Sequence, residues 1–189
     1  MRRVVGLVAL AGLALSACTV ETGAAPSRIA PTCRNGDVLI LYAQSVPTAT
    51  LVPCIREFPA GWTFGGEHVD AGKARFWLDS DRAGIQAVTV SLSRSCDTGG
   101  AVRVPVDPDE AGTERFEAPE VLRPGYAGLR FYTFPGGCVT YRFSFRPGAS
   151  FTQALEATEA LTFFSRAVGV RVLQRQGVTL CGAGVRCPG

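Results

Sequence analysis

The sequence holds few of the side chains on which hydrolases depend. His68 is the single histidine among 189 residues, so it is the only ready general base near neutral pH. No serine lies in a Gly-x-Ser-x-Gly turn, and no cofactor-binding motif is present. These absences favour a binding or structural protein over an enzyme, and we expect no cofactor.

Metal-binding patterns are also missing. There is no Cys-x-x-Cys, and His68 is far from every cysteine in the sequence, which argues against a zinc site. Asp79, Ser80, Asp81 and Gly84 resemble the opening of a calcium loop, but Arg82 places a positive charge inside it. The twelfth position, which needs a bidentate glutamate, is a valine. We therefore expect a turn with an Asp–Arg pair and no metal.

Neither sign of charge dominates the chain. The 19 basic and 16 acidic residues give a net charge of +3, and two of the basic residues, Arg2 and Arg3, belong to the N-terminal targeting segment described next. Without that segment the net charge is +1. A nearly neutral chain is not expected to bind nucleic acid.

The N-terminus has the pattern of an export signal. Arg2 and Arg3 precede an apolar run at residues 4–15, which is shorter than the roughly 20 residues of a membrane-spanning helix. The tetrapeptide Leu-Ser-Ala-Cys at residues 15–18 then matches all four positions of a lipobox. Residues 1–18 therefore resemble a bacterial lipoprotein precursor, and the rest has the general look of small, Arg-rich bacterial lipoproteins.

This resemblance implies where the protein resides. In lipoproteins the lipobox cysteine, here Cys18, receives a diacylglyceryl thioether, the chain is cleaved before it, and the new amine is usually acylated, for example with palmitate. Two or three acyl chains hold a protein stably on a membrane. We expect attachment to the extracytoplasmic face of a bacterial membrane; the alternative is a plain secretory signal or an N-terminal anchor helix.

The composition divides the chain into three parts. Residues 1–17 are the expected signal peptide, and residues 18–32 are the lipidated Cys18 plus a flexible linker rich in Thr, Gly, Ala, Pro and Ser. Residues 33–189 have the length of one domain.

Six cysteines follow Cys18, an even number that predicts three disulfides outside the cytoplasm. Six cysteines permit 15 pairings. We favour pairs between near neighbours, because segments close in a meandering chain meet first: Cys33–Cys54, Cys96–Cys138 and Cys181–Cys187.

Strand patterns dominate the domain. Apolar or alternating segments predict strands at residues 37–43, 62–69, 73–79, 86–93, 129–134, 138–145 and 170–174. Turn residues predict hairpins at residues 70–72 and across a three-residue loop at 135–137. Residues 97–112 are expected to form a loop.

One helix is predicted near the C-terminus. Ser150 as N-cap and Gln153 three residues later form a capping box. A helical stripe follows, before Gly169 ends the helix: Ala154, Ala157, Leu161, Phe164 and Val168. The order of elements predicts an α+β fold, a twisted antiparallel sheet with one C-terminal helix packed on it, or alternatively a β-sandwich with a peripheral helix.

The candidate site residues are few, and each has a structural alternative. His68 between Glu67 and Asp70 could act as a base, with Asp70 sharing its face of a strand and within reach of a hydrogen bond. Asp79 and Asp81 are the paired carboxylates of a hydrolase alternative. An acidic cluster could face a cation or a basic partner: Asp107, Asp109, Glu110 and Glu114.

Aromatic residues offer a second kind of site. Flat rings suit the apolar faces of sugars, although aromatic residues on strands more often belong to the core: Trp62, Phe76, Trp77, Tyr126, Tyr132 and Tyr141. Phe163 lies off the helical stripe and is a candidate protein contact if it is exposed.

These observations favour a non-enzymatic, lipid-anchored envelope protein that binds a protein partner or a cell-wall glycan. The alternative is an envelope hydrolase that uses His68 or paired carboxylates. A solute-capturing lipoprotein is disfavoured by size, because such proteins usually close two lobes around the ligand.

Overall fold

The computed structural model describes residues 29–34, 36–118, 121 and 124–182. Its elements are, in order, α1 (Gly36–Ser45), β1 (Leu51–Ile55), β2 (Trp62–Asp70), β3 (Lys73–Ser80), β4 (Gly84–Ser93), β5 (Val102–Val104), the short 3₁₀ helix η1 (Pro108–Glu110), β6 (Glu114–Glu117), β7 (Ala127–Phe134), β8 (Gly137–Ser144), α2 (Phe151–Ala160), β9 (Leu161–Ser165) and α3 (Arg166–Arg175). The expected signal peptide and Cys18 lie outside the described residues.

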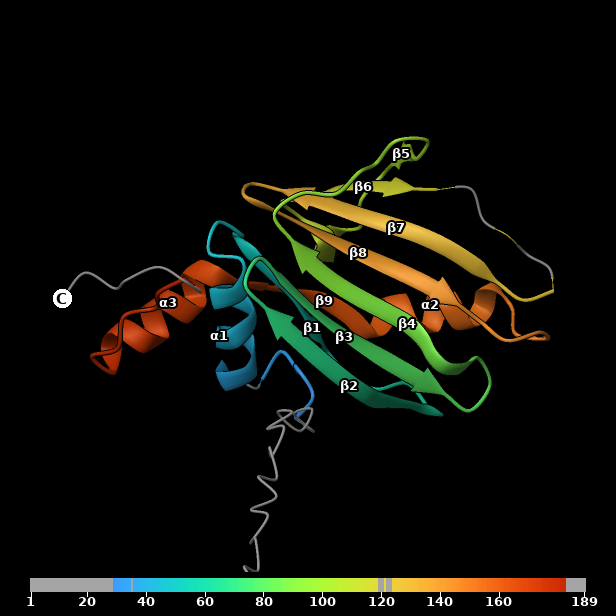
Figure 1. The fold of residues 1–189 in the computed structure, drawn as a ribbon, viewed down its shortest axis with the longest axis horizontal. Helices are drawn as coiled ribbons and strands as arrows, with labels where there is room; N and C mark the ends of the chain where they lie inside the picture. The colour runs from blue at the N-terminus through green and yellow to red at the C-terminus, as the bar shows by residue number, and fades with distance from the viewer. Residues whose placement is uncertain (1–28, 35, 119–120, 122–123, 183–189) are drawn as a thin grey trace, which may run out of the picture.

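The strands form two antiparallel sheets (Figure 1). The larger sheet has seven strands in the order β2-β3-β4-β8-β7-β6-β5, and β1 pairs with β9 in a two-stranded sheet. An antiparallel, sheet-rich fold with helices is therefore confirmed. The finer prediction of one sheet with one helix is incomplete, because the described chain has three α-helices and a second sheet.

One face of the seven-stranded sheet carries the core. Side chains of alternate residues on β3, β4 and β8 are fully or nearly fully buried: Ala74, Phe76, Leu78, Val88, Val90, Leu92, Val139, Tyr141 and Phe143. The two-stranded sheet, α1 and α2 contribute to the same hydrophobic cluster through Val52, Ile55, Leu39 and Ala157. In Figure 1, β9 and α2 lie behind β4.

Residues 37–43 are helical, so the predicted strand there is wrong. In α1 the buried side chains are Val38, Leu39, Tyr42 and Ala43, which repeat at helical spacing. A short apolar run has no clear period, so the sequence alone does not separate a buried strand from a buried helix.

The predicted C-terminal helix is also too long. The capping box is present, with the backbone N–H of Ser150 donating to Oε1 of Gln153 at 2.7 Å, but α2 ends at Ala160. The chain then turns into β9, where Phe163 pairs with Pro53 of β1. Consecutive β-branched and aromatic residues suit a strand, and pairing with β1 outweighs the continued helical spacing.

The predicted strand at residues 170–174 is wrong as well, because this segment belongs to α3. Gly169 lies inside α3 rather than at a helix end. A Cβ atom there would be 3.1 Å from the Phe164 ring, so the glycine lets α3 pack closely on β9.

The remaining predicted strands are confirmed as β2, β3, β4, β7 and β8. The loop between β7 and β8 has two residues, not three, and Gly136 takes the positive φ of 75° that such a turn requires. The segment predicted as a loop at residues 97–112 contains β5 and η1, and the strands β1 and β6 were not predicted.

Two of the predicted disulfides are confirmed, Cys33–Cys54 and Cys96–Cys138. Cys181 is disulfide-bonded, but Cys187 lies outside the described residues, so the third pair stays a prediction.

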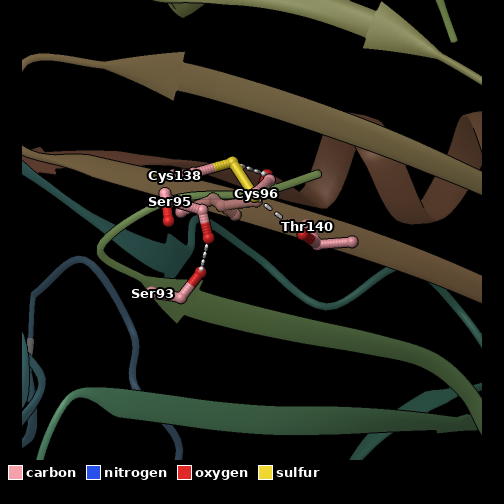
Figure 2. The surroundings of a disulfide bond; sticks show 6 residues. Ser93, Ser95, Cys96, Cys138 and Thr140 are labelled. Atoms are coloured by element: carbon pink, nitrogen blue, oxygen red, sulfur yellow. Dashed lines mark hydrogen bonds between the residues drawn. A yellow bond between two sulfur atoms is a disulfide. The ribbon is translucent and has the colours of Figure 1, made fainter. Parts of the chain in front are cut away.

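Cys96 belongs to the segment of residues 94–101, here named the crossover, which runs from β4 in the sheet interior to β5 at its edge. Figure 2 shows Cys96 joined to Cys138 on β8, with its sulfur 3.1 Å from the Thr140 hydroxyl.

The Cys96–Cys138 bond should be the more stabilising of the two. It joins residues separated by 42 positions, against 21 for Cys33–Cys54. In the chain-entropy account, replacing both cysteines by serine lowers the free energy of unfolding by about 4 kcal/mol for the first pair and about 3 kcal/mol for the second. Urea unfolding without reductant measures both losses; a larger loss for Cys33→Ser/Cys54→Ser would contradict this order.

Candidate functional site

The second face of the seven-stranded sheet carries mostly polar side chains on β3, β4 and β8, and among the described segments only the crossover passes over it. We name the part of this face on β2, β3, β4, β8 and β7 the open face. Trp77, Thr89, Arg142 and Leu129 lie side by side across four neighbouring strands, since each pairs directly with the next. Arg75, Ser91, Thr140 and Phe131 form the neighbouring row. All of these side chains except the buried Phe131 are exposed or half-buried.

Trp77 is held in place by two glycines of β2. The register of β2 shifts between Phe64 and Gly66, which marks a β-bulge. A Cβ atom on Gly65 would lie 2.5 Å from Cδ1 of Trp77, and one on Gly66 would lie 2.6 Å from Cζ2. The indole ring therefore packs against the backbone of both glycines and stays half-buried on the open face.

The charges of the open face are mostly positive. Lys73, Arg75 and Arg142 are exposed, and within the described residues no carboxylate lies at ion-pair distance from them. The two carboxylates of this face are engaged. Asp70 pairs with His68, and Asp79 accepts the backbone N–H of Gln86 at 2.7 Å. The face therefore offers unpaired cations to an anionic ligand.

His68 lies on the edge strand β2, and its predicted contact with Asp70 is present. Nε2 of His68 is 2.7 Å from Oδ2 of Asp70, and both side chains are more than half exposed. Glu67 points to the opposite, buried face and accepts the Tyr42 hydroxyl at 2.7 Å. His68 and Glu67 therefore belong to different surfaces, and the sequence neighbours do not form one site.

Asp79 is the next-to-last residue of β3, and Asp81 belongs to the turn between β3 and β4. Nε of Arg82 is 3.6 Å from Oδ1 of Asp81, which is the expected Asp–Arg pair. Arg82 also pairs with Glu156 of α2 at 2.6 Å, and the guanidinium of Arg146 donates to the backbone oxygens of Asp81 and Arg82. These bonds give the turn a structural role, because they connect the seven-stranded sheet to α2.

The acidic cluster is neutralised by three arginines, one distant in the sequence and two on β5 and β6. Asp109 pairs with Arg56 at 2.5 Å, Glu114 with Arg103 at 2.8 Å, and Asp107 with Arg115 at 3.0 Å. Glu110 is buried, pairs with Arg115 at 2.9 Å and accepts the Tyr132 hydroxyl at 2.7 Å. The cluster thus fastens η1 to β6 and β7.

Most of the predicted aromatic candidates belong to the core. Trp62, Phe76, Tyr126, Tyr132 and Tyr141 are buried, which leaves Trp77 as the candidate on the open face. Phe163 is not an exposed contact: its ring packs 5.1 Å from Tyr132 and 6.3 Å from Phe134. The strand β9, which the sequence did not predict, turns Phe163 inward.

Surface clefts do not coincide with the candidate acid–base residues. Shallow clefts in the described part of the molecule lie beside β5 and β6, between β1 and α3, and beside α2. His68, Asp79 and Asp81 line none of these. Residues 29–34, 36–118, 121 and 124–182 contain no group of three or more potential metal-ligating side chains.

Among the described helices none has the length and apolar character needed to cross a membrane. No family model, curated protein or solved structure matches the chain.

Sequence reasoning missed the basic residues of the open face. The alternation in residues 86–93 and 138–145 places Thr89, Ser91 and Arg142 on the polar faces of their strands. It does not show that β4 and β8 are neighbours, because the 43 residues 94–136 lie between them and tertiary contacts set the pairing. The pair Gly65-Gly66 beside an aromatic-rich strand was the available signal for a close ring contact.

Three buried tyrosines make the fold sensitive to alkaline pH. Burial raises the pKa of Tyr42, and the hydrogen bond and charge of Glu67 raise it further. Burial also raises the pKa of Tyr132; the charge of Arg130 lowers this pKa, and the hydrogen bond to Glu110 raises it. Burial raises the pKa of Tyr141 as well. In the unfolded chain these phenols ionise near their ordinary pKa of about 10, so the folded state alone keeps them neutral above it.

The free energy of unfolding should therefore be steady below about pH 10 and fall above it. At about pH 11 each such tyrosine lowers it by roughly 1.4 kcal/mol relative to neutral pH. Urea unfolding at about pH 8 and about pH 11 measures the change, and Tyr42→Phe should reduce the drop by one tyrosine's share. Equal stability at both pH values would contradict the assignment.

Proposed function

We propose that this protein is a lipid-anchored module of the bacterial cell envelope that binds an acidic cell-wall glycan on its open face. The lipobox at residues 15–18 supports the anchor, and Cys18 is the proposed attachment site. The two disulfides support a location outside the reducing cytoplasm.

The observation that carries the binding proposal is Trp77 on its two glycines, beside Thr89 and Arg142. An indole ring packed against the backbone of two glycines loses little freedom when a ligand stacks on it. Its exposed surface suits the apolar C–H face of a sugar ring. Hydroxyls of Thr89 and Ser91 can exchange hydrogen bonds with sugar hydroxyls, and Lys73, Arg75 and Arg142 attract carboxylates.

The same geometry favours binding over hydrolysis. His68 and Asp70 form a hydrogen-bonded pair, but both are exposed at the sheet edge, and within the described residues no serine or cysteine is hydrogen-bonded to His68. The carboxyl groups of Asp79 and Asp81 are engaged by Gln86 and Arg82. A site for chemistry usually excludes water around its reacting groups, whereas a stacking platform works on an open surface.

The anchor is tested by acyl labelling in intact cells. Growth with a clickable fatty acid should label the protein in the membrane fraction, and Cys18→Ala should remove the label and release the protein from membranes. A Cys33→Ser/Cys54→Ser variant serves as control, because it changes cysteines without changing the lipobox. Label that persists in Cys18→Ala would contradict the lipoprotein assignment.

The glycan site is tested with purified peptidoglycan strands and a neutral dextran as probes. The protein should bind the strands and not the dextran. Trp77→Leu should weaken binding by about 30-fold, as expected for loss of a central aromatic contact, and Arg142→Gln should weaken it by at least about fivefold.

Arg171→Gln on α3 is the matched control and should leave glycan affinity unchanged. Thermal unfolding of each variant shows whether the sheet remains folded. Undiminished binding by folded Trp77→Leu would place the site elsewhere. Failure to bind the strands, together with a protein crosslinked at Trp77 in cells, would favour the protein-partner alternative.

A further inference from the structure

The outward surface of α3 combines exposed valines with arginines. Val168 and Val172 are 39% and 44% exposed and lie one helical turn apart. Arg171 and Arg175 are exposed beside them, also one turn apart. The opposite side of the helix packs on the domain through Leu173, which is buried, and through Arg166, which donates to the backbone oxygen of Ala43 in α1.

Charge is distributed unequally between α3 and the rest of the chain. From residue 160 to the C-terminus there are four arginines and no acidic residue, whereas residues 18–159 carry 13 basic and 16 acidic side chains. The nearly neutral total therefore conceals a basic C-terminal segment on an acidic domain. Such a segment is attracted to an anionic surface while the domain is repelled by it.

Further apolar side chains are exposed near α3. Leu41 on α1 and Val178, just after α3, are each 49% exposed. Figure 1 shows α1 and α3 side by side at one end of the molecule, with α3 projecting beyond the sheets. This end could meet a flat surface without obstruction by the seven-stranded sheet.

We propose that α3 lies on the anionic headgroups of the membrane to which the protein is anchored. Val168 and Val172 would enter the headgroup region, and Arg171 and Arg175 would contact lipid phosphates. Basic, amphipathic helices bind lipid surfaces in this way. The contact would add little affinity beyond that of acyl chains; its effect would be to fix the orientation of the domain.

The location of this contact rests on the proposed anchor at Cys18. Ile29, the first described residue, is eleven positions after Cys18, and at most about 3.6 Å of extended chain per position limits the reach to about 40 Å. The domain is thus always close enough to the bilayer for a weak contact to form. With α3 on the lipid, the open face would point sideways, along the membrane, and stay accessible to a glycan.

The test uses the full mature chain with Cys18→Ala, so that no acyl chain contributes to binding. The probes are vesicles of phosphatidylglycerol and phosphatidylcholine in equal parts, and vesicles of phosphatidylcholine alone. Sedimentation should show binding to the anionic vesicles that weakens with added salt, and much weaker binding to the neutral ones.

Arg171→Gln/Arg175→Gln should weaken binding to the anionic vesicles by about 25-fold, or about fivefold for each arginine. Val168→Ser/Val172→Ser should weaken it by about tenfold, because less apolar surface is buried. Arg75→Gln/Arg142→Gln removes the same charge from the open face and should change the affinity by less than about twofold.

Equal binding to both vesicle types would overturn the proposal, as would full binding by the folded Arg171→Gln/Arg175→Gln variant. An equal loss in Arg75→Gln/Arg142→Gln would also overturn it, since net charge rather than α3 would then govern binding. This experiment is independent of the acyl label on Cys18, so failure of the α3 contact and failure of the lipid anchor give different results.

Discussion

Alternation of apolar and polar side chains along β3, β4 and β8 is the constraint on which the rest of the structure depends. Phe76 and Trp77 are neighbours in sequence, yet one is fully buried and the other faces outward. Because the alternation runs through three adjacent strands, the sheet has one apolar face that must be covered and one polar face that need not be. The sheet β1–β9, α1 and α2 cover the first face, and of the segments that the structure describes only the crossover, held by Cys96–Cys138, passes over the second.

The parts of this fold that local pattern determines were predictable. Strict alternation in residues 86–93 and 138–145 identified β4 and β8, and the Ser150–Gln153 capping box identified the start of α2. The parts of the fold that tertiary contacts determine could not be predicted from the sequence. Residues 161–165 continue a helical apolar spacing, yet they form a strand because β1 offers them a pairing partner, and residues 37–43 are helical because Tyr42 packs on Phe76 and bonds Glu67.

The candidate site follows the same division. Trp77 was identified as a possible sugar-stacking residue, but so were five aromatic residues that the structure buries. Arg142 and Thr89 could not be assigned to the same surface, because the pairing of β4 with β8 joins segments that are distant in the chain. Asp109 of the acidic cluster has a distant partner, Arg56, that no local pattern reveals. The two proposals therefore use separate surfaces, the open face for a glycan and α3 for lipid.

The two tryptophans allow the central claim to be measured within one protein. Trp62 is 3% exposed on the covered face, whereas Trp77 is half-buried on the open face. Hydroxyl-radical footprinting compares their oxidation in purified protein and in intact cells. The account predicts that Trp77 is oxidised far more than Trp62 in the purified protein and becomes protected in cells, where its ligand is present. Equal oxidation of Trp77 in both settings would contradict the claim that the open face is a binding surface.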